Sequence, residues 1–436
     1  MKRGFLNSSK AKQLIDNAVF TQQHPSKNRS HKVHLDFRDV ATEPGLPDGY
    51  ESPKLFSREV ASSTLEYDPN AYIYTCVPAV NTECLVSGHV KRMIYDTSAF
   101  PVLPLPPTRG KAYRIGEAGA KGLGMFSTRL IRAGDLIIDE RPMTFSPANN
   151  AGSFVNPKIP NSHYTLAQHK QVIQHETEKS RKLLFDRLPL EYQKAFMELA
   201  NSHEHDGSGS IVGRIRTNGI ECVGLRDKDT TGDLGRYTCV CKDISRINHS
   251  CCPNANYCWH TESFSVRVYA VRDIPANTEI TIAYCEILRT ASERAKYLLP
   301  YGITSCACSA TCIDPALSKI SDERRVRFNE GSLSLVPSID SFTAPKPGEA
   351  EDRGSHTAVK WVQEMEEEGF QVTSEYRGAA YMLANMYAYL QDVEKALFYA
   401  KKLEGIHKAF EEKTPLFLTE EAVKSSLFYQ LGKGRR

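Results

Sequence analysis

Short apolar segments separated by glycine turns occupy residues 111–145. Alternation of this kind, with a turn residue after each segment, predicts β-strands. The pattern returns from about residue 236, with FSVRVYAV at 264–271 and EITIAY at 279–284 joined by the turn-like DIPAN. Between about 162 and 200 the apolar positions recur at helical spacing instead. We therefore expect one β domain that is split by a helical insertion.

The two ends of the chain have other patterns. A short capped helix is predicted at 8–20, and a single strand-like run lies at 71–77 in a stretch otherwise rich in Pro, Ser, Asp and His. No activity is assigned to this extension. Residues 337–355 have linker composition, and the chain beyond them is predicted to be helical to its end. The segment 383–403 resembles one tetratricopeptide repeat, but without a second copy an ordinary helical hairpin fits equally well.

Composition excludes several classes of protein. The 436 residues are 41% hydrophobic and 25% charged, as in ordinary globular proteins. A net charge of +3 from 55 basic and 52 acidic residues gives no reason to expect direct nucleic-acid binding. No run approaches the roughly 20 apolar residues of a membrane span, and the N-terminus lacks a secretory apolar region. We expect a nuclear or cytoplasmic protein whose twelve cysteines are thiols or metal ligands.

A glycine-rich segment, EAGAKGLGMF, spans 117–126. Gly119, Gly122 and Gly124 allow a sharp turn or a close approach of the backbone to a ligand. A dinucleotide-binding loop is disfavoured, because such a loop opens a helix and the strand-like STRLIRAGDLII comes next here. A glycine-rich β-turn without a ligand is the remaining alternative.

Polar side chains are concentrated in SRINHSCCPNAN at 245–256. This density indicates a site, although a polar turn that satisfies its own backbone has the same composition. A cysteine-protease pairing of His249 with Cys251 is disfavoured, since side chains two residues apart rarely meet in useful geometry.

A cysteine cluster, TSCACSATC, lies at 304–312. Cys306, Cys308 and Cys312 are close enough in sequence to bind one zinc ion as thiolates, and a tetrahedral site needs a fourth ligand. Cys251 or Cys252 would supply it and would attach this segment to the polar one. Three free thiols in a loop are the alternative.

In this order, the glycine segment, RINHSCCPN, EITIAY and the CxC cluster make the chain resemble the SET-domain protein lysine methyltransferases over about 110–312. The helical insertion and helical C-terminus are further similar to the SET-and-MYND subfamily, without a recognisable MYND zinc module. The chain departs from the family at Ile303, where a phenylalanine is common. It departs again at Cys312, because three residues separate this cysteine from the CxC pair, where two are usual in the subfamily.

The resemblance implies an α+β fold made of a β-rich SET domain with a helical insertion, a cysteine-rich post-SET zinc segment and a C-terminal helical unit. The expected parts are a partly irregular extension at 1–108, a SET domain at 109–290 with its insertion at about 150–217, a post-SET segment at 291–320, and a linker with a helical, tetratricopeptide-like unit at 321–436.

The resemblance also implies roles for individual residues. S-adenosyl-L-methionine is expected to be held by Gly122, Leu123, Gly124, Met125, Arg246, Asn248 and His249. Tyr284 takes the place of the family's catalytic tyrosine, and Asn218 matches a residue that lines the substrate channel. A structural Zn²⁺ is expected on Cys251, Cys306, Cys308 and Cys312.

The implied activity is methyl transfer to the side-chain amine of a lysine in a protein substrate, either a histone or another protein. Two alternatives stay open: a SET fold without catalysis that binds a protein or peptide partner, and a zinc-stabilised structural protein. The C-terminal helices are a candidate site for a peptide partner, and neither a membrane nor nucleic acid is an expected partner.

Overall fold

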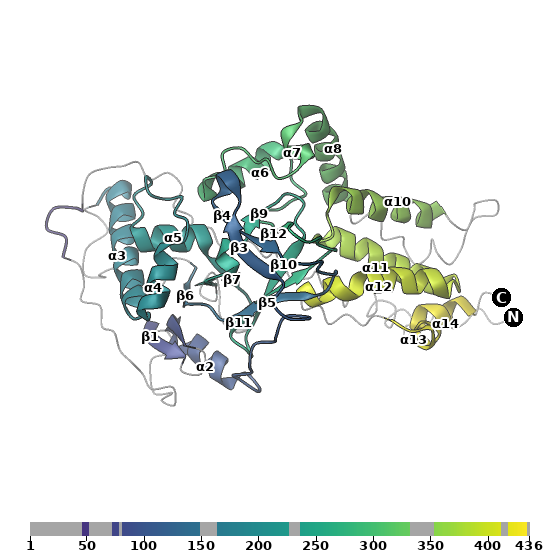
Figure 1. The fold of residues 1–436 in the computed structure, drawn as a ribbon, viewed down its shortest axis with the longest axis horizontal. Coiled ribbons are helices and arrows are strands. Elements are labelled where there is room, and N and C mark those ends of the chain that lie inside the picture. The colour runs from purple at the N-terminus through teal and green to yellow at the C-terminus, as the bar shows by residue number, and fades with distance from the viewer. Residues whose placement is uncertain are drawn as a thin grey trace. The chain divides into compact units, whose positions relative to one another are not determined.

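The computed structural model describes residues 46–51, 72–77, 81–148, 164–225, 236–331, 353–410 and 417–433, all within one compact unit. They combine sheets and helices in the α+β arrangement that the sequence predicts (Figure 1). The expected helix at 8–20 and residues 337–352 of the linker expected at 337–355 lie outside the described residues, and a helix begins at Arg353, inside that expected linker. None of the described helices is long and apolar enough to cross a lipid bilayer.

Three sheets form the β part of the described chain. The first has the strand order β1-β2-β6-β8-β7, the second β10-β11-β5, and the third β3-β4-β12-β9. Their strands are β1 (Tyr72–Val77), β2 (Thr82–Ser87), β3 (Tyr113–Glu117), β4 (Leu123–Ser127), β5 (Leu136–Glu140), β6 (Thr144–Pro147), β7 (Ile220–Cys222), β8 (Tyr237–Val240), β9 (Asn248–His249), β10 (Ala255–His260), β11 (Ser265–Ala270) and β12 (Glu279–Ile282).

Strands β1 and β2 come from the N-terminal extension but share a sheet with β6. The two strands pair with each other in antiparallel fashion, and β2 runs parallel to β6 with Glu83 opposite Thr144. Tyr74 and Leu85 are fully buried and pack against Leu184 of the insertion. The strand pairing therefore crosses the domain boundary expected near residue 108.

The helical insertion contains α3 (Leu166–Asp186), α4 (Leu190–Met197) and α5 (Ser210–Asn218). Helix α3 begins with a capping box, in which Thr165 accepts from the Gln168 backbone N–H and the Gln168 side chain accepts in return. The Glu178 carboxylate of α3 accepts from the first free N–H groups of α5, at 2.9 and 2.8 Å. A negative charge at a helix N-terminus is favourable, so α3 fixes the start of α5.

Past the sheets the described chain is helical, with α6 (Ala291–Leu298), α7 (Ala310–Ile313), α8 (Pro315–Gly331), α10 (Arg353–Glu368), α11 (Ser374–Tyr389), α12 (Val393–Phe410), α13 (Glu420–Ser425) and α14 (Leu427–Lys433). Helices α11 and α12 form the predicted hairpin, with the Tyr387 and Tyr399 rings stacked at 5.7 Å. These helices share an apolar core with Ile287, Leu288 and Phe328 from the segments that precede them.

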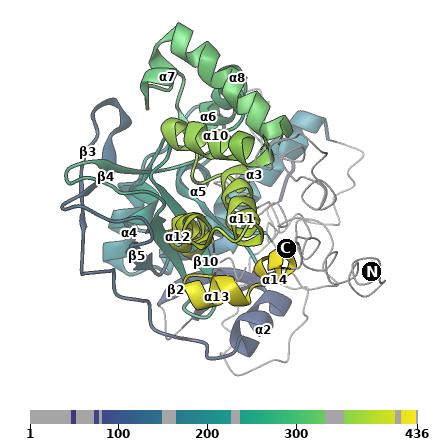
Figure 2. The ribbon, with the colours of Figure 1, turned by 90° about the vertical axis from the view of Figure 1, so that its right-hand side faces the viewer.

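Helix α12 joins this helical unit to the sheets, because it lies against β10 and β11 (Figure 2). At the crossing, Gly405 of α12 meets Gly134 in the turn before β5, where a Cβ on Gly405 would lie 2.8 Å from Gly134 backbone atoms. The Asn256 side-chain amide also donates to the Ala409 carbonyl at 2.8 Å. The close backbone approach thus depends on two glycines.

We predict that Gly405→Ala lowers the thermal unfolding temperature, since the added methyl group would press on backbone and such overpacking costs about 1–3 kcal/mol. Gly378→Ala on α11 is the matched control: no heavy atom lies within 4 Å of its Cβ position. Alanine there should stabilise by about 0.5–1 kcal/mol. Equal effects of the two substitutions in calorimetric scans would contradict the packing argument.

Candidate functional site: three motifs joined by one strand

Strand β12 brings three segments that are distant in sequence into one sheet. It pairs with β4 in antiparallel fashion, with Ile280 opposite Met125. On its other side it runs parallel to β9, with Ile282 opposite His249. The glycine segment, the Asn-His pair and the tyrosine just after β12 therefore meet at one place.

The two glycines of β4 and the turn before it serve different purposes. Gly122 has a φ of +72° and nothing within 4 Å of its Cβ position, so it makes the turn and leaves open space beside the strand. Gly124 has no such space: a Cβ there would lie 2.9 Å from Glu279 Oε1 and 3.0 Å from Asn248 Nδ2. Because Gly124 has no Cβ, the Glu279 and Asn248 side chains can approach the strand closely.

Asn248 is anchored by residues of two other strands in its sheet, β4 and β12. Its Nδ2 donates to the Leu123 carbonyl at 3.1 Å and to Glu279 Oε1 at 2.9 Å. Glu279 also forms an ion pair with Lys121, which offsets its charge. Leu123 is 43% exposed, whereas Met125 is fully buried.

His249 is held between a backbone group and a cysteine. Its Nδ1 lies 3.0 Å from the Tyr284 backbone nitrogen, and its Nε2 lies 3.3 Å from Cys251 Sγ. A backbone N–H can only donate, so Nδ1 is the acceptor and a neutral ring carries its proton on Nε2, toward the sulfur. Both ring nitrogens of His249 are therefore engaged by neighbouring protein groups.

Tyr284 is fixed by its own hydroxyl, which donates to the Ile247 carbonyl at 2.6 Å. Its ring packs at 4.9 Å from Tyr301 and 5.4 Å from His249. Burial raises the pKa of both Tyr284 and Tyr301, so both phenols stay neutral in neutral solution. A third tyrosine, Tyr257, has a buried hydroxyl without a hydrogen-bond partner among the described residues.

Sequence reasoning missed Tyr301 and Tyr257. Tyr301 ends a short turn just before the cysteine cluster, and Tyr257 lies on β10, eight positions after His249. An isolated tyrosine in either place has the sequence signature of an ordinary core residue. Tyr301 packs on Tyr284, and Tyr257 belongs to the apolar core against which Tyr284 packs, so both come near the site only through contacts between distant segments.

Glu140, at the end of β5, holds the turn that leads to Asn248. Its two carboxylate oxygens accept from the backbone N–H groups of Lys242, Asp243 and Ile244 at 2.8 to 3.2 Å. Burial is the largest influence and raises the pKa of Glu140 to about 7, while the backbone hydrogen bonds oppose it and Asp243 adds repulsion. Sequence reasoning missed this role too.

Asn218 and Arg246 lie at the edge of the same turn. The Asn218 side-chain nitrogen donates to the Ala200 and Arg214 carbonyls at 2.7 and 2.8 Å, so both amide hydrogens are used within the insertion. Its backbone carbonyl accepts from Ser245 Oγ at 3.1 Å, which ties α5 to the Asn-His segment. Arg246 lies 3.6 Å from Glu198 of the insertion.

Four cysteines form a cluster at the end of this site. The sulfur atoms of Cys251, Cys306, Cys308 and Cys312, the four cysteines expected to bind zinc, all lie within 4.8 Å of one another. Hydrogen bonding within the cluster lowers the pKa of Cys312 and raises that of Cys308. Four sulfurs so close become thiolates together only around a cation, and four-cysteine sets of this kind suit zinc.

Comparison with known proteins identifies the class of fold. Residues 122–285 match the sequence profile of the SET domain. The matched range includes the glycine segment, the Asn-His pair and Tyr284. The chain therefore contains a SET domain, as the order of its motifs predicted.

Two of the relatives found are named histone-lysine N-methyltransferases. Histone-lysine N-methyltransferase set5 of Schizosaccharomyces pombe is 27% identical over 232 residues, which are 53% of this chain and 56% of the relative. Histone-lysine N-methyltransferase SMYD3 of Homo sapiens is 40% identical over 65 residues, 15% of each chain. The matches thus span about half the length of the first relative and far less of the second, and the resemblance to SET-domain lysine methyltransferases is confirmed.

One solved structure, ctPRC2 in an autoinhibited conformation bound to S-adenosylmethionine, aligns with 74% of this chain and 33% of its own. The identity is 12% and the TM-score 0.20, too low to support an argument.

We predict that replacing Glu140 by glutamine changes how stability depends on pH. A carboxyl whose pKa rises from an unfolded 4.5 to about 7 favours folding most below pH 4.5, and this contribution is lost as pH rises to 7. Glutamine does not titrate. The wild type should therefore lose stability relative to Glu140→Gln between about pH 5 and 7.5, measured by urea unfolding at each pH. A difference that is constant over this range would show that the backbone hydrogen bonds outweigh burial.

Proposed function

We propose that this protein is an S-adenosylmethionine-dependent lysine N-methyltransferase that acts on a protein substrate. The observation that carries the proposal is the meeting of β4, β9 and the end of β12, which places the Gly122 turn, Asn248, His249 and Tyr284 together. These segments are the three that the SET-domain resemblance assigns to cofactor binding and catalysis.

The residues present fit such a cofactor. Gly122 leaves open space beside β4, and the exposed Leu123 and half-buried Asn248 border that space. We assign cofactor binding to Gly122, Leu123, Gly124 and Met125 of the glycine segment and to Arg246, Asn248 and His249. S-adenosylmethionine supplies a methyl group that is already activated by its sulfonium, so the protein's main task is to align it with an amine.

Tyr284 is proposed to orient the reacting groups. Its neutral phenol, fixed on the Ile247 carbonyl, offers a polar atom without a charge. The neighbouring rings of Tyr301 and His249 exclude water, and desolvation lowers the pKa of a lysine ammonium that enters. His249 is a positioning residue, because Tyr284 and Cys251 already engage both of its nitrogens.

The insertion is proposed to border the substrate channel. Ser202, in the loop after α4, donates to the Pro300 carbonyl at 2.7 Å, immediately before Tyr301. Asn218 ends α5 and, with its amide hydrogens engaged, would contact a substrate through oxygen only. Zn²⁺ on the four clustered cysteines is proposed to be structural, since all four tetrahedral positions are then filled by protein.

We predict that the purified full chain binds S-adenosylmethionine and that Asn248→Ala weakens this binding by about 10- to 100-fold. The substitution removes a hydrogen-bonding group beside a charged ligand, which is worth about 1.5–3 kcal/mol. Isothermal titration with zinc in the buffer measures both affinities. Asn385→Ala on α11, where the amide donates to Tyr381 within the helix, is the matched control and should bind as the wild type does.

No binding by a folded, zinc-loaded wild-type protein would reject the enzyme. The function left would then be a SET fold that binds a protein or peptide partner without catalysis.

We further predict that Tyr284→Phe lowers kcat by about 10- to 100-fold, with the cofactor Kd unchanged within about threefold. The hydroxyl is expected to act on the reacting groups and not on the cofactor's affinity. The assay measures methyl transfer to lysine peptides from histones and other proteins, with arginine-for-lysine peptides as blanks. Tyr297→Phe, on the exposed side of α6, serves as the control. A Tyr284→Phe enzyme with wild-type kcat would remove this tyrosine from the mechanism.

A further inference from the structure

Two arginines lie buried beside the cysteine cluster. Arg294 of α6 is 2% exposed and Arg325 of α8 is fully buried. Buried charges are costly unless an opposite charge or a full set of hydrogen bonds compensates them. The groups around the two arginines therefore indicate which negative charge compensates them.

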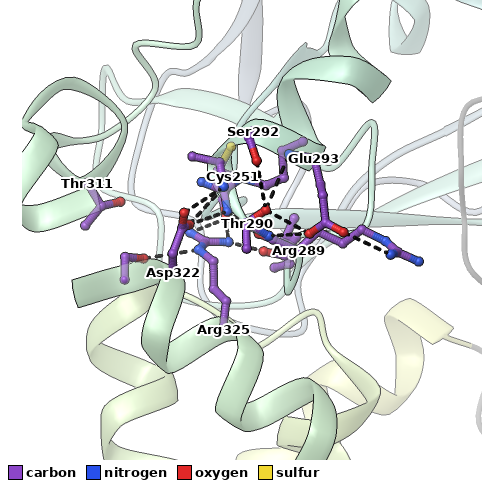
Figure 3. Close-up of polar contacts among 12 residues, drawn as sticks. Cys251, Arg289, Thr290, Ser292, Glu293, Thr311, Asp322 and Arg325 are labelled. Atoms are coloured by element: carbon purple, nitrogen blue, oxygen red, sulfur yellow. Dashed lines mark hydrogen bonds and ion pairs between the residues drawn. The ribbon is translucent and has the colours of Figure 1, made fainter. Parts of the chain in front are cut away.

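Arg325 reaches from α8 to the backbone of the cysteine ligand (Figure 3). Its Nη1 and Nη2 each donate to the Cys251 carbonyl at 3.4 Å, Nη1 also donates to the Ile287 carbonyl, and Nε donates to Ser321 Oγ at 3.1 Å. The guanidinium lies 4.4 Å above the Phe370 ring. All of these partners are uncharged. Glu368, which accepts from Ser321, already forms an ion pair with Arg324 at 2.7 Å.

Arg294 of α6 is held by a backbone carbonyl and a carboxylate. It donates to the Arg289 carbonyl and lies 3.4 Å from Asp322 Oδ1. Asp322 is shared, because its carboxylate also accepts from the Ala291 backbone N–H at 2.9 and 3.0 Å (Figure 3). The Nε of Arg294 is buried without a hydrogen-bond partner among the described residues, and negative charge on Cys251 or Cys312 would raise the pKa of its guanidinium.

Two neighbouring buried guanidinium groups need negative charge nearby. Arg294 repels Arg325, Asp322 attracts Arg294 and Glu368 attracts Arg325, while Cys251 and Cys312 as thiolates attract both arginines. Zn²⁺ with four thiolates carries a net charge of −2, and two guanidinium ions carry +2. Asp322 supplies one negative charge beside Arg294, and a filled tetrathiolate site would supply the rest, which uncharged thiols would not.

We propose that Arg294 and Arg325 are the counter-ions of a zinc tetrathiolate at Cys251, Cys306, Cys308 and Cys312, and that they position Cys251 as the fourth ligand. The inference rests on the proposed zinc ligation and is independent of methyl transfer. It also links the metal to the C-terminal helices, because Arg325 joins Cys251 to Phe370.

The test is zinc affinity of the full-length chain, measured by competition with a chromogenic chelator in the absence of S-adenosylmethionine and substrate. Arg325→Met and Arg294→Met should each weaken zinc binding by about 10- to 100-fold, the usual effect of losing a residue that supports metal ligands. Arg325→Lys, which keeps the charge but not the planar hydrogen-bonding geometry, should fall between the wild type and Arg325→Met.

Arg327→Met is the matched control on α8. This arginine forms an ion pair with Glu364 and is 47% exposed, so its loss should leave zinc affinity unchanged. Cobalt substitution gives a second readout, since its thiolate charge-transfer bands report four sulfur ligands whether or not the protein is active. Binding by both methionine variants as tight as that of the wild type would overturn the proposal, and so would an Arg325→Lys variant as weak as Arg325→Met.

Discussion

The imidazole of His249 connects the two halves of this site. One nitrogen accepts the Tyr284 backbone N–H, and the other points to Cys251 Sγ. The end of β12 and the cysteine cluster therefore cannot move independently of each other. Because Asn248 precedes His249 on β9, the anchoring of Asn248 on Leu123 and Glu279 is held by the same contact. A displacement of the cluster would therefore be transmitted to Asn248 and the glycine segment through the His249 ring.

Support for that ring comes from groups far away in sequence. Glu140 fixes the turn before β9, and Arg325 fixes the Cys251 carbonyl just after it. Helix α12 packs over β10 and β11 at the Gly134–Gly405 crossing, so the C-terminal helices stiffen the sheet beside the site. Interiors packed this closely transmit strain, which makes the helical unit part of the architecture of the site.

The sequence was sufficient for the motifs and for the fold class, because β12, β4 and β9 each carry a local signal and their order is characteristic. Cysteine spacing alone left Cys251 and Cys252 open as the fourth ligand, the family resemblance favoured Cys251, and the fold brings Cys251 to the cluster. Glu140, Arg294 and Arg325 could not be found from the sequence. Each is an ordinary charged residue in sequence, and only contacts across the fold bury it. The pairing of β2 with β6 escaped prediction for the same reason.

Charge balance at the cysteine cluster matters for the reaction proposed nearby. A lysine must lose its proton before it can attack a methyl group, and a net negative field beside the channel would favour the ammonium. An uncompensated zinc tetrathiolate, touching His249 and one ring away from Tyr284, would exert such a field. As the proposed counter-ions, Arg294 and Arg325 would reduce this field, and Tyr284 and Tyr301 add no charge because burial raises the pKa of each phenol. The two arginines would thus support both the proposed metal site and the reactivity of the entering amine.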